Sequence, residues 1–528
     1  LHSEAVNWFY RAAAAAPEHF PIFFNLGISL SASGHPIEAI EAYKKVLRLK
    51  PDLKEAFFCL GNTYWQIGRD EEAAEAFENA LKLDADYTDA AVNLAEIKND
   101  EAALQLLAQK NPQDARPFYY LGRRKFTQQK YSEANLYLQQ ADFLQENAEI
   151  KTILGETLLF LQKKDEALPF FYAALRLDPH NSAAALHIAD LEAEKANYAE
   201  AEKYYKKAGE LNPDSVQMHA NYANMLCRLK RTLEALEEYR AAVRLAPEQP
   251  ELSYNLAIIL KTLEEYEQAL ALMFNAFYLA PHHIDWSLNI AETITLFYAK
   301  SHEKALKIAE NWYEKMPENT VAKHLWAVLN GKSSDNETEY NRLLFDCFAE
   351  NYENVLKNIS YNVVEKMAEI IPPLKGKVLD LGCGTGLIGE KFKNTDNVFY
   401  GIDLSAAMLK LAESKKVYQN LEHTDALAYL ERHKNEFSAI ISADVFCYFG
   451  ELRPLLDAAS PVRIIFSVET DSLTETYKIQ PTGRYKHNPQ YVEKLLKEAG
   501  YKAVKSYPLI LRKENNEDVT GIIFDAYV

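Results

Sequence analysis

Residues Val378–Gly389 read VLDLGCGTGLIG, an apolar strand that runs into a glycine-rich turn and then into a helix. The strand ends at Asp380, and three glycines follow at alternate positions: Gly382, Gly384 and Gly386. Glycine lets the backbone adopt positive φ and approach a ligand closely. A dinucleotide-binding turn has the spacing G-x-G-x-x-G, but position 387 is a leucine here. The segment therefore predicts a ligand-binding turn of another kind.

The residues around this turn alternate between short apolar runs and amphipathic stretches. The runs are KVLDLG, VFYGIDL, FSAIISADV, VRIIFSVE, SYPLILR and GIIFDAYV, and helical segments such as SAAMLKLAESKK lie between them. Strand–helix alternation is typical of a parallel α/β sheet with helices on both faces. Only KENNEDVT joins the last two strands, which is too short for a crossover helix. We therefore expect those two strands to be antiparallel neighbours.

Acidic residues also stand at the ends of the next three expected strands. Asp403 ends the apolar run that follows the glycine turn, Asp425 and Ala426 lie in the segment HTDA, and Asp444 lies in SADVFCYFG. Ligands of open α/β sheets bind at the carboxyl ends of the strands. The four segments together predict one ligand site at that edge.

The part of the chain before the α/β pattern is a repeat with a period of about 34 residues. Prolines mark this period, and they stand at Pro179, Pro213, Pro247 and Pro281, and also at Pro17 and Pro51. Each unit has a large residue followed by a small one, as in Leu60-Gly61 and Leu154-Gly155. This pattern resembles the tetratricopeptide repeat, a helix–turn–helix unit that stacks into a superhelix with a concave face. About nine units are expected over residues 1–331.

Two units depart from the period, and the chain begins inside a unit. The unit around Leu94 is short, because its counterpart Leu121 follows sooner than the period requires, and the last unit is slightly stretched. The first unit is only a second helix, so we expect further sequence before Leu1. The polar stretch 332–339 predicts a linker, followed by the α/β domain at 340–528.

Asparagines recur just before the large–small pair of the repeats. Asn221, Asn255 and Asn289 follow one another at the period of the repeat, which would stack them as a ladder. A side-chain amide both donates and accepts, so it can hold the backbone of an extended peptide. The alternative is that asparagine is simply common at this position of the repeat. On the first interpretation, a protein or peptide partner binds in the groove of the array.

The segment VLDLGCGTGL resembles motif I of the class I S-adenosylmethionine-dependent methyltransferases. With the array and the stretches FDCFAENYENVL and PTGRYKHNPQYVEKLLKEAGY, the chain resembles the bacterial group of predicted methyltransferases that carry tetratricopeptide repeats. The resemblance implies a seven-stranded Rossmann-like sheet whose last strand is antiparallel, with S-adenosylmethionine as cofactor and S-adenosylhomocysteine as product. It implies that Asp403 binds the ribose hydroxyls and Asp425 the adenine amino group. The full set of implied cofactor residues is Asp380, Gly382, Cys383, Gly384, Gly386, Asp403, Leu404, Met408, Asp425, Ala426 and Asp444.

Methyl transfer needs an aligned nucleophile and the exclusion of water more than it needs a catalytic group. The candidates for the acceptor site are residues expected on the rim: Tyr352, Asp444, Tyr448, Arg484, Tyr485 and His487. The last three are expected in a loop after the fifth strand. Each could instead be solvated surface or a structural hydrogen-bonding residue. Cys447 lacks the preceding proline of a nucleophilic cysteine, so we expect it to be structural.

The composition limits the possible partners. The chain is 48% hydrophobic and 25% charged, and its net charge is −18, which disfavours nucleic acid and anionic membranes as partners. Five scattered cysteines without C-x-x-C spacing fit a reducing, cytoplasmic setting and indicate neither a disulfide framework nor a metal site. No apolar run approaches the roughly 18 residues of a membrane span.

Three functions are consistent with these observations. The first is a methyltransferase whose array recruits a protein acceptor. The second is a small-molecule or glycan methyltransferase whose array serves assembly. The third is a non-catalytic scaffold, which the intact glycines and the strand-end aspartates argue against.

Overall fold

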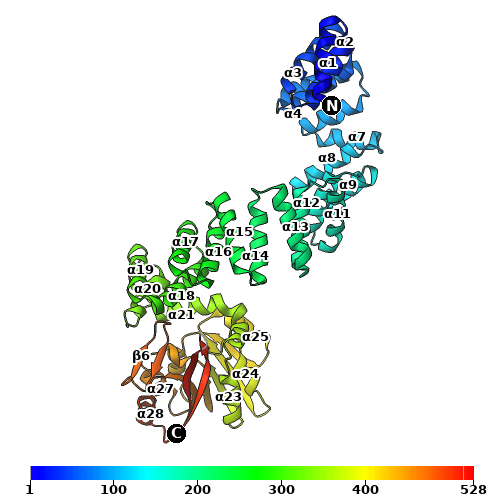
Figure 1. Ribbon diagram of the computed structural model, residues 1–528. Helices are drawn as coiled ribbons and strands as arrows, with labels where there is room; N and C mark the ends of the chain where they lie inside the picture. The colour runs from blue at the N-terminus through cyan, green and yellow to red at the C-terminus, as the bar shows by residue number, and fades with distance from the viewer. Residues whose placement is uncertain (1, 515–516) are drawn as a thin grey trace. The chain divides into compact units, whose positions relative to one another are not determined.

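The computed structural model describes residues 2–514 and 517–528, and Figure 1 shows the order of its elements. The chain forms two compact units, Leu1–Leu245 and Ala246–Val528. The division falls within the repeats, so the second unit contains the last helices of the array together with the α/β domain. No described helix is long and apolar enough to cross a membrane.

The first unit consists of fifteen helices of the repeat array. Their bounds are α1 His2–Ala15, α2 Phe20–Ala32, α3 Pro36–Leu49, α4 Lys54–Gln66, α5 Asp70–Leu83, α6 Thr88–Ile97, α7 Glu101–Lys110, α8 Ala115–Thr127, α9 Tyr131–Leu144, α10 Ala148–Phe160, α11 Lys164–Leu177, α12 Ser182–Glu194, α13 Tyr198–Leu211, α14 Val216–Arg228 and α15 Thr232–Leu245. The short unit is α6 and α7, which have ten residues each. Helices such as α11 and α13 end two residues before a periodic proline, since proline cannot continue the turn.

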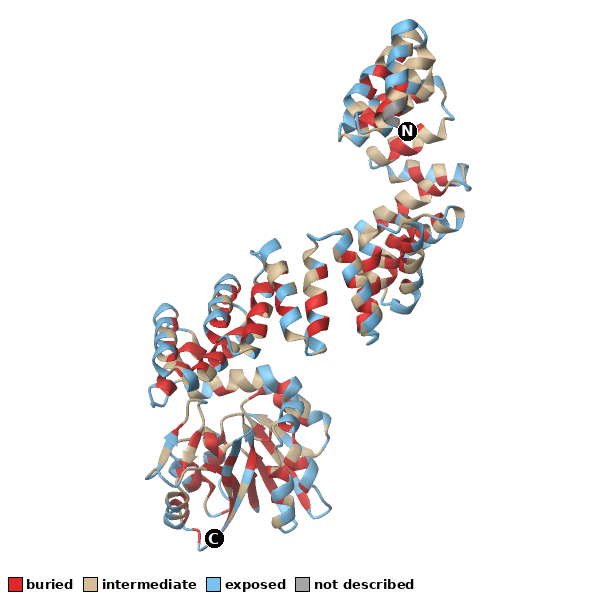
Figure 2. Ribbon diagram, viewed as in Figure 1, coloured by how far each residue is buried: buried red, intermediate tan, exposed pale blue. Residues whose placement is uncertain are grey.

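Close contact between paired helices explains the small residue of each repeat. A Cβ at Gly61 would lie 2.7 Å from the ring of Phe77, and one at Gly155 would lie 2.7 Å from the ring of Phe171. Both rings are fully buried. The small residue on one helix therefore makes room for the large one on the next, which buries apolar surface at each pair (Figure 2).

The second unit begins with five more helices of the array. They are α16 Pro250–Thr262, α17 Tyr266–Leu279, α18 Ile284–Lys300, α19 His302–Lys315 and α20 Thr320–Leu329. The stretched last unit reflects α18, which has 17 residues. After a short turn come the segments α21 Glu337–Phe348, η1 Ala349–Asn351, α22 Tyr352–Asn358 and α23 Val363–Ile370. The stretch 332–339, expected to be a linker, thus includes the first turn of α21.

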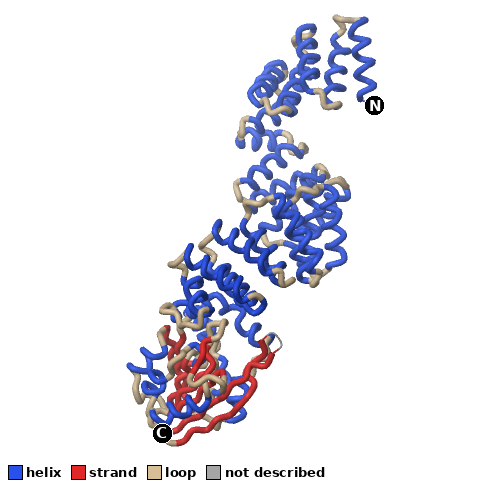
Figure 3. The backbone as a smooth tube through the Cα atoms, turned by 60° about the vertical axis from the view of Figure 1, so that its left-hand side comes forward, coloured by secondary structure: helices blue, strands red, loops and turns tan. Residues whose placement is uncertain are grey.

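A nine-stranded mixed sheet follows, and it is visible as the strand-rich part of Figure 3. Its strands are β1 Gly376–Leu381, β2 Asn397–Asp403, β3 Tyr418–His423, β4 Ala439–Ser442, β5 Arg463–Thr470, β6 Tyr477–Ile479, β7 Tyr485–His487, β8 Ala503–Glu514 and β9 Glu517–Tyr527. The helices between them are α24 Leu387–Phe392, α25 Ala406–Ser414, α26 Ala426–Arg432, η2 Phe446–Tyr448, α27 Arg453–Ala459 and α28 Pro489–Glu498.

The strand pairing confirms the expected fold class. Strands β3, β2, β1, β4 and β5 are parallel in that order, and β9 pairs antiparallel with both β5 and β8. The sheet exceeds the expected seven strands because the short hairpin β6–β7 joins the end of β5. Alternate residues of β1 face opposite cores: Leu379 packs on the side of α26 to α28, and Val378 on the side of α23 and α24.

The hairpin β6–β7 also joins the sheet to the last repeat. Val328 of α20 packs in one cluster with Ile479 and Tyr485 of the hairpin. The turn of the hairpin also packs closely against α20, because a Cβ at Gly483 would lie 2.9 Å from Nε2 of His324. His324 is 3% exposed and stacks on Tyr340 of α21. The last repeat and the α/β domain therefore share a small apolar cluster.

Candidate functional site

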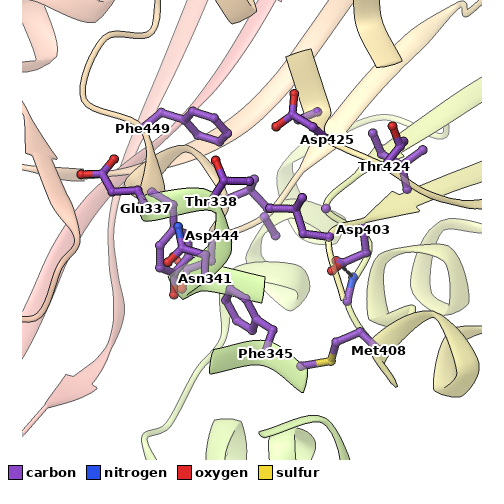
Figure 4. Close-up of a pocket in the computed structure, with 18 of the residues that line it drawn as sticks. Glu337, Thr338, Asn341, Phe345, Asp403, Met408, Thr424, Asp425, Asp444 and Phe449 are labelled. Atoms are coloured by element: carbon purple, nitrogen blue, oxygen red, sulfur yellow. Dashed lines mark hydrogen bonds between the residues drawn. The ribbon is translucent and has the colours of Figure 1, made fainter. Parts of the chain in front are cut away.

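A cavity of about 300 Å³ opens at the carboxyl ends of the parallel strands (Figure 4). Its residues come from the glycine turn after β1, from the ends of β2, β3 and β4 and the segments that follow them, and from α21 and α22. They are Glu337, Thr338, Asn341, Phe345, Tyr352, Gly382, Gly384, Ile402, Asp403, Leu404, Met408, Thr424, Asp425, Ala426, Ala443, Asp444, Val445, Tyr448, Phe449, Gly450 and Glu451. This is the edge where α/β sheets bind ligands.

The glycine turn needs glycine for two different reasons. Gly382 has φ +73°, and a Cβ there would lie 2.4 Å from Val445 after β4, so no other residue fits. Gly384 has φ +52°, and the closest atom to an added Cβ is in the ring of Tyr352, 3.9 Å away. A side chain at Gly384 would therefore find room only beside the cavity. The turn brings bare backbone to the cavity wall.

Asp403 ties this turn to the end of β2. Its Oδ2 accepts a hydrogen bond from the N–H of Gly384 at 2.8 Å, and its Oδ1 accepts one from the N–H of Ser405 at 2.9 Å. Burial raises the pKa of the Asp403 carboxyl, although these backbone donors oppose the shift. Each oxygen keeps a second lone pair for a donor inside the cavity. Asp403 can therefore accept hydrogen bonds from ligand hydroxyls.

The other two strand-end aspartates have partners that limit their roles. Asp425 caps α26, because its Oδ1 accepts a hydrogen bond from the N–H of Ala428 at 3.0 Å. Asp444 has φ +60°, and its Oδ2 lies 2.7 Å from Nη2 of Arg484. Burial alone would raise the pKa of Asp444, but Arg484 and Arg512 outweigh it and hold the pKa below its usual value.

A buried charge network lies behind the Asp444 wall of the cavity. Arg484 also bonds Glu469 on β5 and donates to the hydroxyl of Tyr448 at 3.0 Å. Arg512 on β8 is 2% exposed and bonds the same carboxylate, Glu469, at 2.7 Å. The network fixes the segment after β4, and with it Tyr448, in one position against the cavity.

Helix α21 covers the cavity and is held at both ends. Near its carboxyl end, Asp346 accepts a hydrogen bond from the hydroxyl of Ser405, at the start of α25, at 2.6 Å. At its first residue, Glu337 accepts one from the hydroxyl of Tyr485 on β7 at 2.7 Å. Between them Phe345 meets the ring of Tyr448 edge-on, with centroids 5.4 Å apart. This covering helix excludes water from much of the strand edge.

Comparison with known proteins identifies both parts of the chain. A family model described as "Methyltransferase domain" matches residues 378–462, which contain the glycine turn and the ends of β1, β2, β3 and β4. Models described as "TPR repeat" and "Tetratricopeptide repeat" match residues 38–68, 54–87 and 161–225. The chain is a tetratricopeptide-repeat protein with a methyltransferase domain.

One curated relative matches part of the chain. It is the putative methyltransferase YqeM of Bacillus subtilis, 30% identical over 108 residues, which are 20% of this chain and 42% of YqeM. The chain thus spans about two fifths of the length of this relative.

Solved structures resemble the repeats. YrrB, described as a TPR protein with an unusual peptide-binding site, is 19% identical, with 39% of this chain and 94% of YrrB covered and a TM-score of 0.24. MamA is 26% identical, with 36% and 95% covered and a TM-score of 0.21. PilF of Pseudomonas aeruginosa is 20% identical, with 44% and 94% covered and a TM-score of 0.30. These TM-scores are too low to support a conclusion about function.

Eight of the eleven predicted cofactor residues line the cavity of the methyltransferase domain. They are Gly382, Gly384, Asp403, Leu404, Met408, Asp425, Ala426 and Asp444. The other three lie beneath or beside the glycine turn. Asp380 and Cys383 are buried, and Gly386 is the residue directly before α24. Among the described residues, no group of three or more His, Cys, Asp or Glu side chains is placed to hold a metal ion.

The acceptor-site candidates divide into two groups. Tyr352, Asp444 and Tyr448 line the cavity, whereas Arg484, Tyr485 and His487 do not. The expectation of a loop at 484–487 was wrong, because Tyr485–His487 form strand β7. His487 is fully buried, and its Nε2 lies 3.1 Å from the carbonyl oxygen of Gly450. His487 therefore supports Gly450, which lines the cavity, and does not reach the cavity itself. Cys447 is fully buried too, and its Sγ lies 3.1 Å from Nη2 of Arg484.

The asparagines of the array have different surroundings. Nδ2 of Asn221 donates to Oδ1 of Asp190 at 2.9 Å, within the first unit. Nδ2 of Asn289 donates to the carbonyl of Asp285, one turn back on its own helix, at 3.1 Å. Their role toward a peptide stays a prediction.

The sequence interpretation missed the residues that α21 and the segment after β4 bring to the cavity. Glu337, Thr338, Asn341 and Phe345 reach the cavity from one face of α21, and Phe449, Gly450 and Glu451 reach it from the segment after β4. The spacing of Thr338, Asn341 and Phe345, about one turn apart, was a usable signal of a common helical face. The polar composition of NGKSSDNETEY hid it, because a polar helix start resembles a linker.

The buried carboxyl of Asp380 predicts that the stability of the methyltransferase domain depends on pH. It is fully buried, its Oδ2 accepts from the hydroxyl of Tyr418 at 2.6 Å, and burial raises its pKa to about 7. An unfolded Asp titrates near 3.9. Because the folded state holds the proton more tightly, stability falls as pH rises from about 4 to about 7.

We therefore expect Asp380→Asn to stabilise the domain at pH 8 by roughly 2–4 kcal/mol relative to its effect at pH 4. The amide oxygen keeps the Tyr418 bond and carries no charge. Thermal unfolding at both pH values measures the difference. Asp457→Asn, at an exposed position of α27, is the control and should show no such trend. A gain that does not change with pH would contradict the buried titration of Asp380.

Proposed function

We propose that the chain transfers a methyl group from S-adenosylmethionine to an acceptor carried by a protein that the repeats recruit. The observation that carries the proposal is the convergence of Gly384, Asp403 and Asp425 on one covered cavity at the strand ends. The matched family model spans the same segments.

The residues present fit the cofactor. Asp403 has lone pairs free for two ribose hydroxyls, and Asp425 keeps Oδ2 free for an amino group beside Ala426. The space beside Gly384, which a side chain would fill, suits the methionine moiety of S-adenosylmethionine. When bound, the cofactor supplies a sulfonium methyl group that is already activated for displacement.

The residues of this chain then position the acceptor and exclude water from the cavity. The rings of Phe345, Tyr352 and Tyr448 form an apolar wall that excludes water and orients the acceptor. The network of Arg484 keeps Tyr448 in place. A base is needed only if the acceptor must lose a proton.

A second candidate acceptor is a free small molecule. The cavity favours it, because all of its lining residues lie between Glu337 and Glu451 and none belongs to a repeat helix. A protein acceptor would have to place one side chain into this cavity. In this second case the array would serve assembly.

A label partition separates the two acceptors. The chain is incubated with methyl-labelled S-adenosylmethionine and a lysate of its source organism, and macromolecules are then separated from small solutes. We expect label in discrete protein bands. Label in the small-solute fraction alone would establish the second candidate, and absence of label from both would count against methyl transfer.

Replacing Asn221, Asn255 and Asn289 together by Ala should lower kcat/KM for a protein acceptor about tenfold or more. The reason is that the ladder amides would no longer hold the backbone of the partner, at a loss of about 0.5–1.5 kcal/mol per hydrogen bond. Affinity for S-adenosylmethionine should stay within twofold, since the cavity is untouched. Turnover of the protein acceptor at the unchanged rate would remove the argument from the ladder.

A further inference from the structure

The inner face of α21 carries Asn341, whose side-chain amide has no hydrogen-bond partner in the part of the chain that the structure describes. Asn341 is 8% exposed and lines the cavity, where Figure 4 shows it near Asp444 and Phe345. Its side chain makes no hydrogen bond with any described residue. The amide of Asn341 therefore offers both a donor and an acceptor to a ligand in the cavity.

Two carboxylates that line the same cavity have no cationic partner. Oε1 of Glu337 accepts from the hydroxyl of Tyr485 and, at 3.2 Å, from the N–H of Ser334, while Oε2 has no partner among the described residues. Glu451 accepts from the hydroxyl of Tyr491 at 3.0 Å and from the N–H of Arg453 at 2.9 Å. In the described part of the chain no Lys, Arg or His nitrogen lies within 4.0 Å of either carboxylate.

These two carboxylates differ from Asp444, whose charge Arg484 and Arg512 compensate. Hydrogen bonds hold both Glu337, which is half-buried, and Glu451, which is exposed, and neither carboxylate forms an ion pair with a described residue. None of the residues that line the cavity is Lys, Arg or His, so a carboxylate acceptor would meet only like charge. The rings of Phe345, Tyr448 and Phe449 also line the cavity, and aromatic faces attract cations.

We propose that the methyl acceptor is an amine, which enters as an ammonium group recognised by Glu337, Glu451 and the amide of Asn341. This inference rests on the proposed methyl transfer and names the substrate class of the same site. The amine belongs either to a side chain of a recruited protein or to a free small molecule.

The reaction balances without any further reagent. The ammonium group releases one proton to Glu337 and from there to water. The nitrogen lone pair then forms the new N–C bond while the S–C bond breaks, and the electron pair of that bond remains on sulfur. The products are a methylammonium group and the neutral thioether.

Binding of small probes tests the recognition directly. With S-adenosylhomocysteine bound, the full chain is titrated with n-butylammonium, 1-butanol and butyrate at pH 7, and binding is followed by NMR. We expect n-butylammonium to bind at least about tenfold more tightly than the other two, the effect of one compensated charge. Equal binding of the three probes, or no binding of the ammonium, would overturn the amine assignment.

Two substitutions test whether Glu337 and Asn341 bind the ammonium group. Glu337→Gln and Asn341→Ala should each weaken n-butylammonium binding about fivefold to tenfold. Glu339→Gln is the matched control, because Glu339 lies on the same helix, is paired with Arg342 and does not line the cavity. It should leave the binding of the probe unchanged. An equal loss in Glu339→Gln would show that the charge of the helix, and not the site, is responsible.

The chemistry of the labelled product gives an independent readout. N-methyl groups survive mild alkali, whereas methyl esters release methanol, and chromatography after acid hydrolysis separates methylated amines from methyl ethers. Methylated lysine in the protein fraction supports a protein amine, and a methylated free amine supports a small acceptor. A methyl ester or ether as the main product overturns the amine assignment. If S-adenosylhomocysteine does not bind at all, the proposed methyl transfer fails, which the titration reveals separately.

Discussion

Gly384→Asp should weaken the binding of S-adenosylmethionine at least about 100-fold, to a level that calorimetric titration of the purified chain barely detects. The glycine N–H donates to Asp403, and the only neighbour of an added Cβ is the ring of Tyr352 at 3.9 Å. The new carboxylate would therefore enter the cavity, where it occupies space meant for ligand and adds a negative charge beside Asp403. Aspartate tolerates φ +52° better than most residues, so the fold should survive.

Gly34→Asp provides a matched control for this prediction. Gly34 also has positive φ, +79°, and an added Cβ would meet nothing within 4 Å. It lies in the first unit, between α2 and α3. The same change in charge and backbone strain should leave cofactor affinity unaltered there. If Gly384→Asp also bound S-adenosylmethionine normally, the cofactor site would not be at the glycine turn.

Arg484→Met should destabilise the methyltransferase domain by about 3–5 kcal/mol, because it leaves buried carboxylates without a partner. Arg484 bonds Asp444 and Glu469, whose side chains are 11% and 4% exposed. Arg512 remains, but one guanidinium cannot compensate two carboxylates. For a domain of this size the loss corresponds to a decrease in Tm of roughly 6–15 °C, measured by differential scanning calorimetry.

Arg453→Met is the control for the network. Arg453 pairs with Glu498, but both side chains are well exposed, and exposed pairs contribute about 0–1 kcal/mol. The Tm should therefore change by no more than a few degrees. Equal effects of the two substitutions would show that the Arg484 cluster contributes no more than a surface pair. Both variants keep the glycine turn intact, so residual cofactor binding at low temperature checks that they fold.

The strand edge was predictable from sequence because each of its parts is local. The glycine turn after β1 and the acids at the ends of β2, β3 and β4 follow directly from short apolar runs and their last residues. The rule that parallel strands share a carboxyl edge then brings them together without further information. The antiparallel last pair followed from the length of its connection in the same way.

The roles of α21 and of Arg484 were not predictable in this way, because they depend on contacts between distant segments. Asp346 meets Ser405 across 59 residues, and Tyr485 meets Glu337 across 148. Arg484 could be a rim residue or a buried one until β5, β8 and the hairpin are placed around it. The hairpin itself had a local signal, since Pro481-Thr482-Gly483 separates two short alternating runs.

The apolar cluster that α20 shares with the hairpin β6–β7 limits where the repeats can be separated from the methyltransferase domain. A chain cut at the predicted boundary between residues 331 and 332 would lose Val328 and His324, and Ile479 and Tyr485 would be left facing water. The residue next to that exposed turn is Arg484, whose bonds order the cavity wall. Repeats farther from the domain contact only the repeats on either side, so they can be gained or exchanged without affecting the domain. The terminal repeat, in contrast, can change only together with the hairpin β6–β7, so it evolves with the methyltransferase domain and not with the interchangeable part of the array.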